Sequence, residues 1–508
     1  MISVQSPVLP IWMKYKENIM NYSSPEKMGI SSKHVLAFYK ELEQCCLSTH
    51  AVILSRGNDV FSECYYAPFH KDFKHRMYST SKSFVSVAIG FCEQDGLLCL
   101  DDPLMKFFPE YREAPCQHSA TIRQMLQMKT TLHNSKGWFQ AGTEDRTRFY
   151  FEKAPQKDPG TLYAYDSAGS YMLGVVVEKV TGKPFLQYLQ EKVLDDIGFS
   201  RDAYCLQCPG GHSWGDSGIM CTARDLWLFA RFVLNKGVWN GKRYLNEEYL
   251  KQATNTSVST NVYGFHDMHN SQGYGYQFWG APRGCFATKG MGNQVALCDP
   301  AQDFIFVINS CNQGNTIAYE QIYRALYRNI IDNLGEPLPE DPAAKAELDA
   351  YLAKQKLFCL QGNTESPLAE KINGRIFQCA PSDTGIKWFR LDFAGKEGKF
   401  TYENAQGQKC MPFGLGHNVF AKFPQEGYPD MVGTVPAPGN FYDAAFSADW
   451  PEEKLLRLRV QIIDKYMGNL AILFGFRDEN AVTVRMEKAA EAFLQEYTGL
   501  ISAEAAYS

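Results

Sequence analysis

The sequence contains no apolar run long enough to cross a membrane as a helix, which would need about 20 consecutive apolar residues. Its first residues also lack the cationic segment followed by an apolar stretch that a signal peptide requires. Both observations argue against export or membrane insertion. We therefore expect a cytoplasmic protein that makes no contact with a membrane.

Runs of basic residues are absent as well. The 51 Lys and Arg residues and the 56 Asp and Glu residues are well mixed along the chain, and the formal net charge is -5. A protein that binds nucleic acid or an anionic membrane usually concentrates positive charge on one segment or face. The charge pattern therefore argues against those partners and leaves small, uncharged or cationic molecules as ligands. Nothing in the sequence indicates an oligomeric state.

Cysteine and histidine do not form a complete metal-binding pattern. Cys205 and Cys208 are spaced as in half of a zinc site, with His212 nearby, but no second pair follows that would complete four ligands. The 15 cysteines are scattered through a long chain, which favours free thiols in a reducing compartment over a disulfide framework. We expect neither a metal ion nor an organic cofactor.

The composition is that of a globular protein with more than one domain. The 508 residues are 45% hydrophobic, enough for a full core divided among two or three domains. Helical and strand-like segments are mixed over residues 1–337, which predicts an α+β domain. The Pro-rich, charged segment 338–365 is typical of a helical linker. Alternating strands over 366–508 predict a small antiparallel β-barrel or β-sandwich domain. Its strands are expected at 375–380, 387–393, 399–404, 418–423, 454–463, 470–476 and 481–486.

Ser79 stands three residues before Lys82 in the segment YSTSKS, and a long apolar run follows. The run FVSVAIGFC is apolar around most of a helix, so this helix should cross the core with its first turn at the surface of a cleft. A spacing of three residues places the lysine on the same helix face as the serine. Ser24 and Lys27 have the same spacing, but Ser24 precedes a proline and is typical of a helix cap.

The residue types at this helix start suit acyl transfer. The partial positive charge and free N–H groups of a helix N-terminus favour the anionic oxygen that forms when a serine attacks a carbonyl. Partial burial of Lys82 favours a neutral amine, which can accept the serine proton. The other interpretation is structural: Ser79 caps the helix and the Lys82 side chain extends toward solvent.

Further segments follow this pair in a characteristic order: DGLLCLDDPLMKFFPEY, TIRQMLQM, PGTLYAYDSAGSYMLGVVVEKVTGKPF, SGIMCTARDLWLFARFVLNKGVWNGKRYL and ATKGMGNQVALCDPAQDFIFVINS. With them the sequence resembles the serine β-lactamase and penicillin-binding-protein superfamily over roughly residues 25–330. Within it the sequence is most similar to class C β-lactamase-like esterases, amidases and 6-aminohexanoate-oligomer hydrolases. The resemblance implies an antiparallel sheet flanked by helices, an all-helical subdomain, and an active site in the cleft between them.

The resemblance also implies roles for individual residues. Ser79 would be the nucleophile and Lys82 its base. Tyr165, in the segment YDS, would take the proton from the serine and pass it to the leaving group. Ser167 stands where the family has an asparagine that binds the substrate amide. Tyr163 is the neighbouring competitor for the role of the tyrosine.

A third family motif, Lys/His-Thr/Ser-Gly on a strand lining the cleft, corresponds loosely to Thr288-Lys289-Gly290. The lysine is one position late, and strand alternation points Lys289 away from the face of Thr288. In β-lactamases and transpeptidases the cation at the first position binds the substrate carboxylate, so its displacement argues against β-lactam and D-Ala-D-Ala substrates. Gly290 and Gly292 would let the backbone approach the substrate. The N–H of Met291 would complete the oxyanion hole with that of the nucleophile.

Two other groups of residues could carry catalysis instead. The segment GHSWG around Ser213 matches the nucleophile elbow of α/β-hydrolases, but that elbow needs a buried apolar strand before it and a helix after it, and neither flank fits. His266 and His269 could belong to a histidine-based triad, although histidines in such a Gly- and Asn-rich loop are commonly exposed. Their aromatic neighbours, with Trp138 and Phe139, are expected to wall the substrate cleft.

Taken together, these observations predict a serine hydrolase that cleaves a small-molecule ester or amide through an acyl-enzyme on Ser79. Three alternatives stay open. The first is a penicillin-binding D-Ala carboxypeptidase or β-lactamase, the second is an acyltransferase that uses the same acyl-enzyme, and the third is a catalytically inactive binding homologue.

Overall fold

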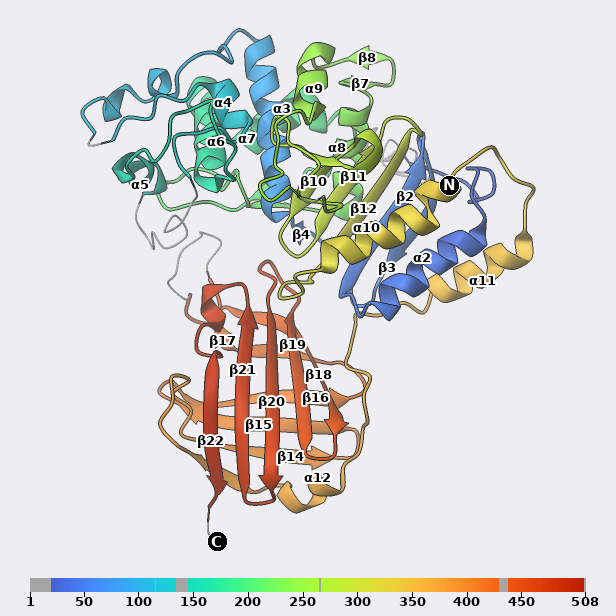
Figure 1. The fold of residues 1–508 in the computed structure, drawn as a ribbon, viewed down its shortest axis with the longest axis vertical. Coiled ribbons are helices and arrows are strands. Elements are labelled where there is room, and N and C mark those ends of the chain that lie inside the picture. The colour runs from blue at the N-terminus through green and yellow to red at the C-terminus, as the bar shows by residue number, and fades with distance from the viewer. Residues whose placement is uncertain (1–19, 115, 134–144, 265, 429–436, 507–508) are drawn as a thin grey trace, which may run out of the picture.

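The computed structural model describes residues 20–506 except 115, 134–144, 265 and 429–436. Figure 1 shows two units that follow one another along the long axis of the molecule. The first unit holds a sheet with helices on both faces and a group of helices beside it, and the second is a β-barrel. Within these residues no helix combines the length and the apolar character needed to span a membrane.

The central sheet of the first unit has seven strands in the order β1-β3-β2-β12-β11-β10-β9. Neighbouring strands are antiparallel except β1 and β3, which are parallel. The two halves of the sheet come from distant parts of the chain and meet where β2 pairs with β12, for example at Ile53 and Val307. The strands are β1 (Asn21–Tyr22), β2 (Thr49–Arg56), β3 (Asp59–Tyr65), β9 (Trp279–Ala281), β10 (Cys285–Gly290), β11 (Gln294–Asp299) and β12 (Phe304–Ser310).

Both faces of this sheet are buried, which explains why β2 consists almost entirely of buried residues. Val52 and Leu54 face a core shared with α2, α10 and α11, whereas Ala51 and Ile53 face the core that contains α8. The sheet is therefore the middle layer between two sets of helices. These helices are α2 (Ser32–Gln44), α8 (Ala223–Leu234), α10 (Ala318–Asn329) and α11 (Pro342–Leu352).

A group of helices lies beside the sheet, with α3 (Ser81–Gln94) at its centre. Residues 81–92 of α3 are all buried, as the apolar character of this segment around the whole helix predicts. Its most extensive helix contact is with α6 (Ser167–Thr181). This arrangement confirms the expected antiparallel sheet flanked by helices with a helical subdomain. Other helices of the group are α4 (Ile122–Leu126), α5 (Arg146–Glu152), α7 (Phe185–Leu189) and α9 (Glu247–Thr254).

The second unit is a closed barrel of nine strands, with β17 paired to β18 as a tenth strand. Its strands pair antiparallel, except that a short parallel pairing between β16 and β18 closes the ring. The short helix α12 (Pro367–Ile372) lies at the end remote from the first unit. The strands are β13 (Ile376–Cys379), β14 (Trp388–Ala394), β15 (Glu397–Asn404), β16 (Gly407–Leu415), β17 (Val419–Glu426), β18 (Phe441–Glu452), β19 (Leu455–Ile462), β20 (Asn469–Asp478), β21 (Ala481–Ala489) and β22 (Gly499–Ala505).

The predicted β domain is thus a barrel in the structure, and it contains strands that the sequence pattern did not reveal. The strand β16 contains Pro412 and Gly414, which weaken a strand pattern, and β18 is interrupted by Ala444 and Ala445 in place of β-branched residues. Closure of the barrel gives both strands partners on each side, and this outweighs their weak local preference.

Two kinds of connection join the units. The helix α11 packs against α2 on the first unit, and the chain then continues into the barrel. Direct hydrogen bonds also cross between them. Ser48 Oγ donates to Gln461 Oε1 at 2.6 Å, and Asn469 Nδ2 donates to the carbonyl oxygens of Cys311 and Gln313 at 3.0 and 2.9 Å.

Candidate active site

Ser79 lies in a 3₁₀ turn, η1 (Tyr78–Thr80), that leads directly into α3. The short strand β4 (His75–Arg76) precedes the turn and pairs with β6 (Ile219–Cys221). From residue 75 to residue 92 every side chain is buried except that of Ser79, which is half-buried. The serine is therefore the point at which this core segment reaches the surface.

Lys82 is placed to exchange a proton with Ser79. Its side chain is 1% exposed, and its Nζ donates hydrogen bonds to Ser79 Oγ at 2.9 Å and to the carbonyl oxygen of Asp216 at 2.8 Å. The spacing of three residues at the start of a helix produces this contact. The second bond holds the amine in place, so it points at the serine hydroxyl rather than at solvent.

Asp216 is a part of the site that the sequence did not indicate. Its carboxylate is fully buried, and Oδ2 lies 3.8 Å from Lys82 Nζ. Among the described residues neither carboxylate oxygen receives a hydrogen bond. Burial raises the pKa of Asp216, while the charges of Lys82, Arg146 and Arg76 oppose that rise. Because Asp216 sits in a glycine-containing loop far from Ser79 in the sequence, only the folded chain brings it to the lysine.

Tyr165 joins the pair through its ring. Lys82 Nζ lies 5.2 Å from the centroid of the Tyr165 ring, which stacks on Trp279 at 5.5 Å. Within the described residues no hydrogen bond links the Tyr165 hydroxyl to Ser79 or Lys82. The competing Tyr163 contacts Tyr274 at 5.4 Å instead, and burial raises the pKa of its hydroxyl. Of the two tyrosines, Tyr165 is the one in contact with the lysine.

Strand β10 brings Thr288 and Gly290 against the turn that carries the serine. Thr80 Oγ1 lies 3.4 Å from Thr288 Oγ1 and donates to the carbonyl oxygen of Gln294 at 3.0 Å. A Cβ at Gly290 would lie 2.2 Å from the carbonyl oxygen of Met77. Only glycine permits this close approach of the strand to the turn.

The other residues expected near the oxyanion lie close by in the chain. Met291 is 43% exposed at the turn after β10, and Gly292 has a φ of +77°, a left-handed conformation that favours glycine. Ser310 Oγ donates to the carbonyl oxygen of Gly292 at 2.7 Å and holds this turn. Ser167 is the buried first residue of α6, two positions after Tyr165.

Lys289 points away from Thr288, as strand alternation predicts. Its Nζ lies 3.8 Å from the centroid of the Trp279 ring and donates to the carbonyl oxygen of His269. Burial lowers the pKa of Lys289 to about 7. The third motif therefore places no cation at the position of Thr288. The Lys289 amine and the Tyr165 ring both contact the ring of Trp279.

The rival residues lie elsewhere or have other partners. Ser213 is buried and its N–H donates to Glu178 Oε1 at 3.3 Å, while His212 Nδ1 bonds Glu178 Oε2 at 2.7 Å. The antiparallel sheet rules out the nucleophile elbow of an α/β-hydrolase. All 15 cysteines are free, and no group of three or more possible metal ligands occurs in the described part of the chain.

Among the described residues, no hydrogen bond links His266 or His269 to Ser79. His266 is exposed, and His269 stacks on Tyr319 at 5.3 Å. Trp138 and Phe139, which were expected to wall the cleft, lie outside the described residues.

Comparison with known proteins identifies the family of the chain. A model of the Beta-lactamase family matches residues 42–328, more than half of the chain. The chain belongs to the Beta-lactamase family. This β-lactamase-family protein is 26% identical over 290 residues to a 6-aminohexanoate-dimer hydrolase of Paenarthrobacter ureafaciens, a match covering 53% of this chain and 73% of the relative.

Solved structures resemble this β-lactamase-family protein in fold. One, titled "Putative 6-aminohexanoate-dimer hydrolase from Bacillus anthracis", has a TM-score of 0.52 and 19% identity and covers 63% of this chain and 88% of its own. The octameric penicillin-binding protein homologue from Pyrococcus abyssi has a TM-score of 0.48 and 16% identity, and it covers 92% of this chain and 99% of its own. The β-lactamase-family protein therefore has a β-lactamase fold.

Proposed function

We propose that the protein hydrolyses a small-molecule ester or amide through an acyl-enzyme on Ser79. The observation that carries the proposal is the contact of 2.9 Å between Ser79 Oγ and Lys82 Nζ at the one half-buried position of a buried segment. A serine hydroxyl beside an amine that is held by a carbonyl oxygen is the arrangement that nucleophilic catalysis requires.

The proposed reaction has two stages. Ser79 Oγ attacks the substrate carbonyl while its proton passes to Lys82 Nζ, and the tetrahedral oxyanion is stabilised by the N–H groups of Ser79 and Met291. Tyr165 and Lys82 then return the proton to the leaving alcohol or amine. Water deprotonated by the same pair attacks the ester on Ser79, and the released acid leaves the serine free. Ser167 would contact the substrate.

The substrate class follows from the polar groups that surround the serine. Thr288 faces the serine turn, but Lys289 is turned to Trp279, so the third motif does not place its cation on the face of Thr288. We therefore favour a neutral ester or amide over a β-lactam or a D-Ala-D-Ala peptide. The free cysteines support a cytoplasmic location as part of this proposal.

The test is hydrolysis of p-nitrophenyl butyrate by the wild type, by Ser79→Ala and by Ser213→Ala as the control serine. We expect activity to disappear in Ser79→Ala alone. Mass spectrometry of the wild type after acid quenching should find the butyryl group on the peptide that contains Ser79. Full activity in Ser79→Ala, or an acyl group on another residue, would contradict the proposal.

The same preparation separates the alternatives. A stable adduct with labelled penicillin on Ser79 would indicate a penicillin-binding enzyme. Partition of the acyl group toward an added alcohol or amine would indicate an acyltransferase. Binding of ligands without any acyl-enzyme would indicate an inactive homologue.

A further inference from the structure

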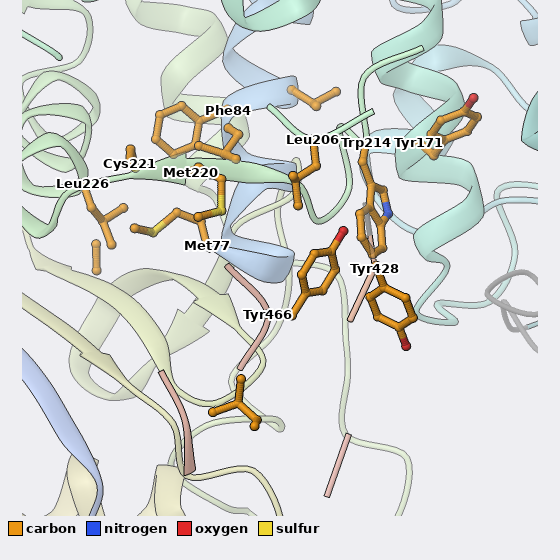
Figure 2. Packing of buried hydrophobic residues seen from close by; sticks show 14 of the residues in the cluster. Met77, Phe84, Tyr171, Leu206, Trp214, Met220, Cys221, Leu226, Tyr428 and Tyr466 are labelled. Carbon is orange, nitrogen blue, oxygen red and sulfur yellow. The ribbon is translucent and has the colours of Figure 1, made fainter. Parts of the chain in front are cut away.

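Two segments of the barrel unit reach the turn that carries Ser79. One is the connection 463–468 between β19 and β20, and the other is the segment 490–494 after β21. Figure 1 shows this end of the barrel facing the first unit, and Figure 2 shows Tyr466 and Tyr428 beside Trp214 and below Met77. The contact lies at residues 76–78, immediately before the proposed nucleophile.

Tyr78 makes the most direct connection. Its side chain is 2% exposed, and its hydroxyl accepts a hydrogen bond from the N–H of Met467 at 3.0 Å. The same hydroxyl lies 3.1 Å from the carbonyl oxygen of Met467 and 3.2 Å from Glu491 Oε1, so its proton has two acceptors. Among the described residues, the hydrogen-bond partners of this hydroxyl all belong to the barrel.

Arg76 forms a second connection beside the first. Its Nη1 lies 3.3 Å from Glu491 Oε1, and its Nε donates to the carbonyl oxygen of Ser217 at 3.1 Å. The guanidinium also lies 4.1 Å from the Trp214 ring and 4.7 Å from the Tyr466 ring. Arg76 therefore links the barrel to Ser217. The residue before Ser217 is Asp216, whose carbonyl oxygen accepts a hydrogen bond from Lys82.

The backbone of Tyr78 requires such support. Its φ is +46°, which places an aromatic residue in the left-handed region one position before Ser79. This conformation is unfavourable for a residue with a bulky side chain and persists only where surrounding contacts hold it. Tyr78 directly precedes Ser79 in the same 3₁₀ turn, so its backbone conformation is part of the turn that carries the serine.

We propose that the barrel forms part of the catalytic centre, with Met467 and Glu491 holding Tyr78 and Tyr78 acting as a positioning residue for Ser79. This inference rests on the hydrolysis proposed above. Tyr78 takes no part in bond formation; its hydroxyl anchors the turn so that Ser79 Oγ stays in line with Lys82 Nζ. An ordinary contact between domains would stabilise the protein without affecting the rate of acylation.

A matched control exists in the same interface. Ser48 Oγ donates to Gln461 Oε1 at 2.6 Å, a buried bond between the same two units that does not involve the turn at Ser79. Tyr78→Phe removes the hydroxyl and keeps the ring, and Ser48→Ala removes a comparable bond. The full-length chain is used for both variants, and thermal unfolding measures the loss of stability that they share.

The experiment measures kcat and KM for p-nitrophenyl butyrate and the rate at which a fluorophosphonate labels Ser79. For Tyr78→Phe we expect kcat and the labelling rate to fall about tenfold to a hundredfold with KM nearly unchanged, because misplacement of a nucleophile affects the chemical step. Ser48→Ala should lower the melting temperature and leave kcat and the labelling rate at the wild-type level. Glu491→Gln keeps an acceptor for Tyr78 but loses the charge near Arg76, so its kcat and labelling rate should lie between those of Tyr78→Phe and Ser48→Ala.

Two results would overturn the inference. In the first, Tyr78→Phe keeps the wild-type kcat and labelling rate while Ser79→Ala is inactive, so the hydrolysis proposal stands and the positioning role fails. In the second, Tyr78→Phe and Ser48→Ala lose activity equally, which identifies a general effect of the interface. Activity in Ser79→Ala, or a wild type that fluorophosphonate does not label, would instead refute the hydrolysis proposal and this inference with it.

Discussion

Acidification should weaken the protein through two histidines buried near the junction of its units. His50 on β2 and His75 on β4 are 0% and 1% exposed, and their ring centroids lie 5.4 Å apart. His50 also stacks on Phe69 at 3.8 Å, and Phe69 packs against Ala445 and Ile463 of the barrel. Protonation of either ring would place a charge in this apolar contact.

The direction of the effect follows from both pKa shifts, and its size follows from the pKa of His75. Burial lowers the pKa of His75 from 6.5 to about 3, with a smaller effect of His70 in the same direction. Burial, then His75 and Arg459, hold the pKa of His50 well below its ordinary value. The unfolded chain therefore binds protons first, so stability is complete above the unfolded pKa and is lost as the pH falls below it. His75 should cost about 2 kcal/mol at about pH 5, and His50 should add a loss in the same direction.

Urea denaturation at about pH 7.5 and about pH 5, followed by tryptophan fluorescence, measures this loss. His75→Phe should reduce the difference between the two conditions by about 2 kcal/mol, and His50→Phe should reduce it as well. His34, which is exposed, provides the control, and His34→Gln should leave the difference unchanged. If both buried variants keep the full pH dependence of the wild type, the reasoning is wrong.

Three further predictions concern the site. Gly290→Ala should destabilise the protein by about 1–3 kcal/mol and slow acylation, because its Cβ would clash with the carbonyl oxygen of Met77. The control is Gly475→Ala, whose Cβ would meet nothing closer than 3.8 Å, and it should have neither effect. Urea denaturation and butyrate hydrolysis measure the two effects. Asp216→Asn removes a buried carboxylate 3.8 Å from Lys82 Nζ that would stabilise the positive charge formed when Lys82 accepts the serine proton, so kcat/KM for butyrate hydrolysis should fall, and an unchanged kcat/KM would contradict the pairing. Burial lowers the pKa of Lys289 from 10.5 to about 7, so this residue destabilises the fold below the unfolded pKa. Lys289→Met should therefore raise the unfolding free energy at about pH 7 by about 2–4 kcal/mol and flatten its rise toward pH 10, and a lower free energy would refute this.

The sequence predicted those features that depend on local patterns. The all-round apolar run after Lys82 predicted a buried helix, and α3 is buried along residues 81–92. Helical spacing also predicted that Lys82 would lie beside Ser79, where its Nζ donates to the hydroxyl. Strand alternation predicted most of the barrel, including β14 and β21.

Features that depend on contacts between distant segments escaped the sequence. Asp216 meets Lys82 only because β4 pairs with β6, and no local motif marks that aspartate. The Tyr78 hydroxyl bonds to Met467, nearly 400 residues away in the sequence, and an aromatic residue before a serine carries no signal of that bond or of a left-handed backbone. The roles of Ser79, Lys82 and Tyr165 stay predictions until the variants are measured.

The pairing of β2 with β12 has a consequence for how the chain is made. The hairpin of β2 and β3 emerges early from the ribosome, but its partner begins only at Phe304. At 5–20 residues per second, the apolar edge of β2 waits roughly 10 to 50 seconds for that strand. An unpaired apolar strand edge is a site of aggregation, so the nascent chain needs shelter during this interval. Chaperone dependence of the yield should therefore fall sharply once residues 304–310 have left the exit tunnel.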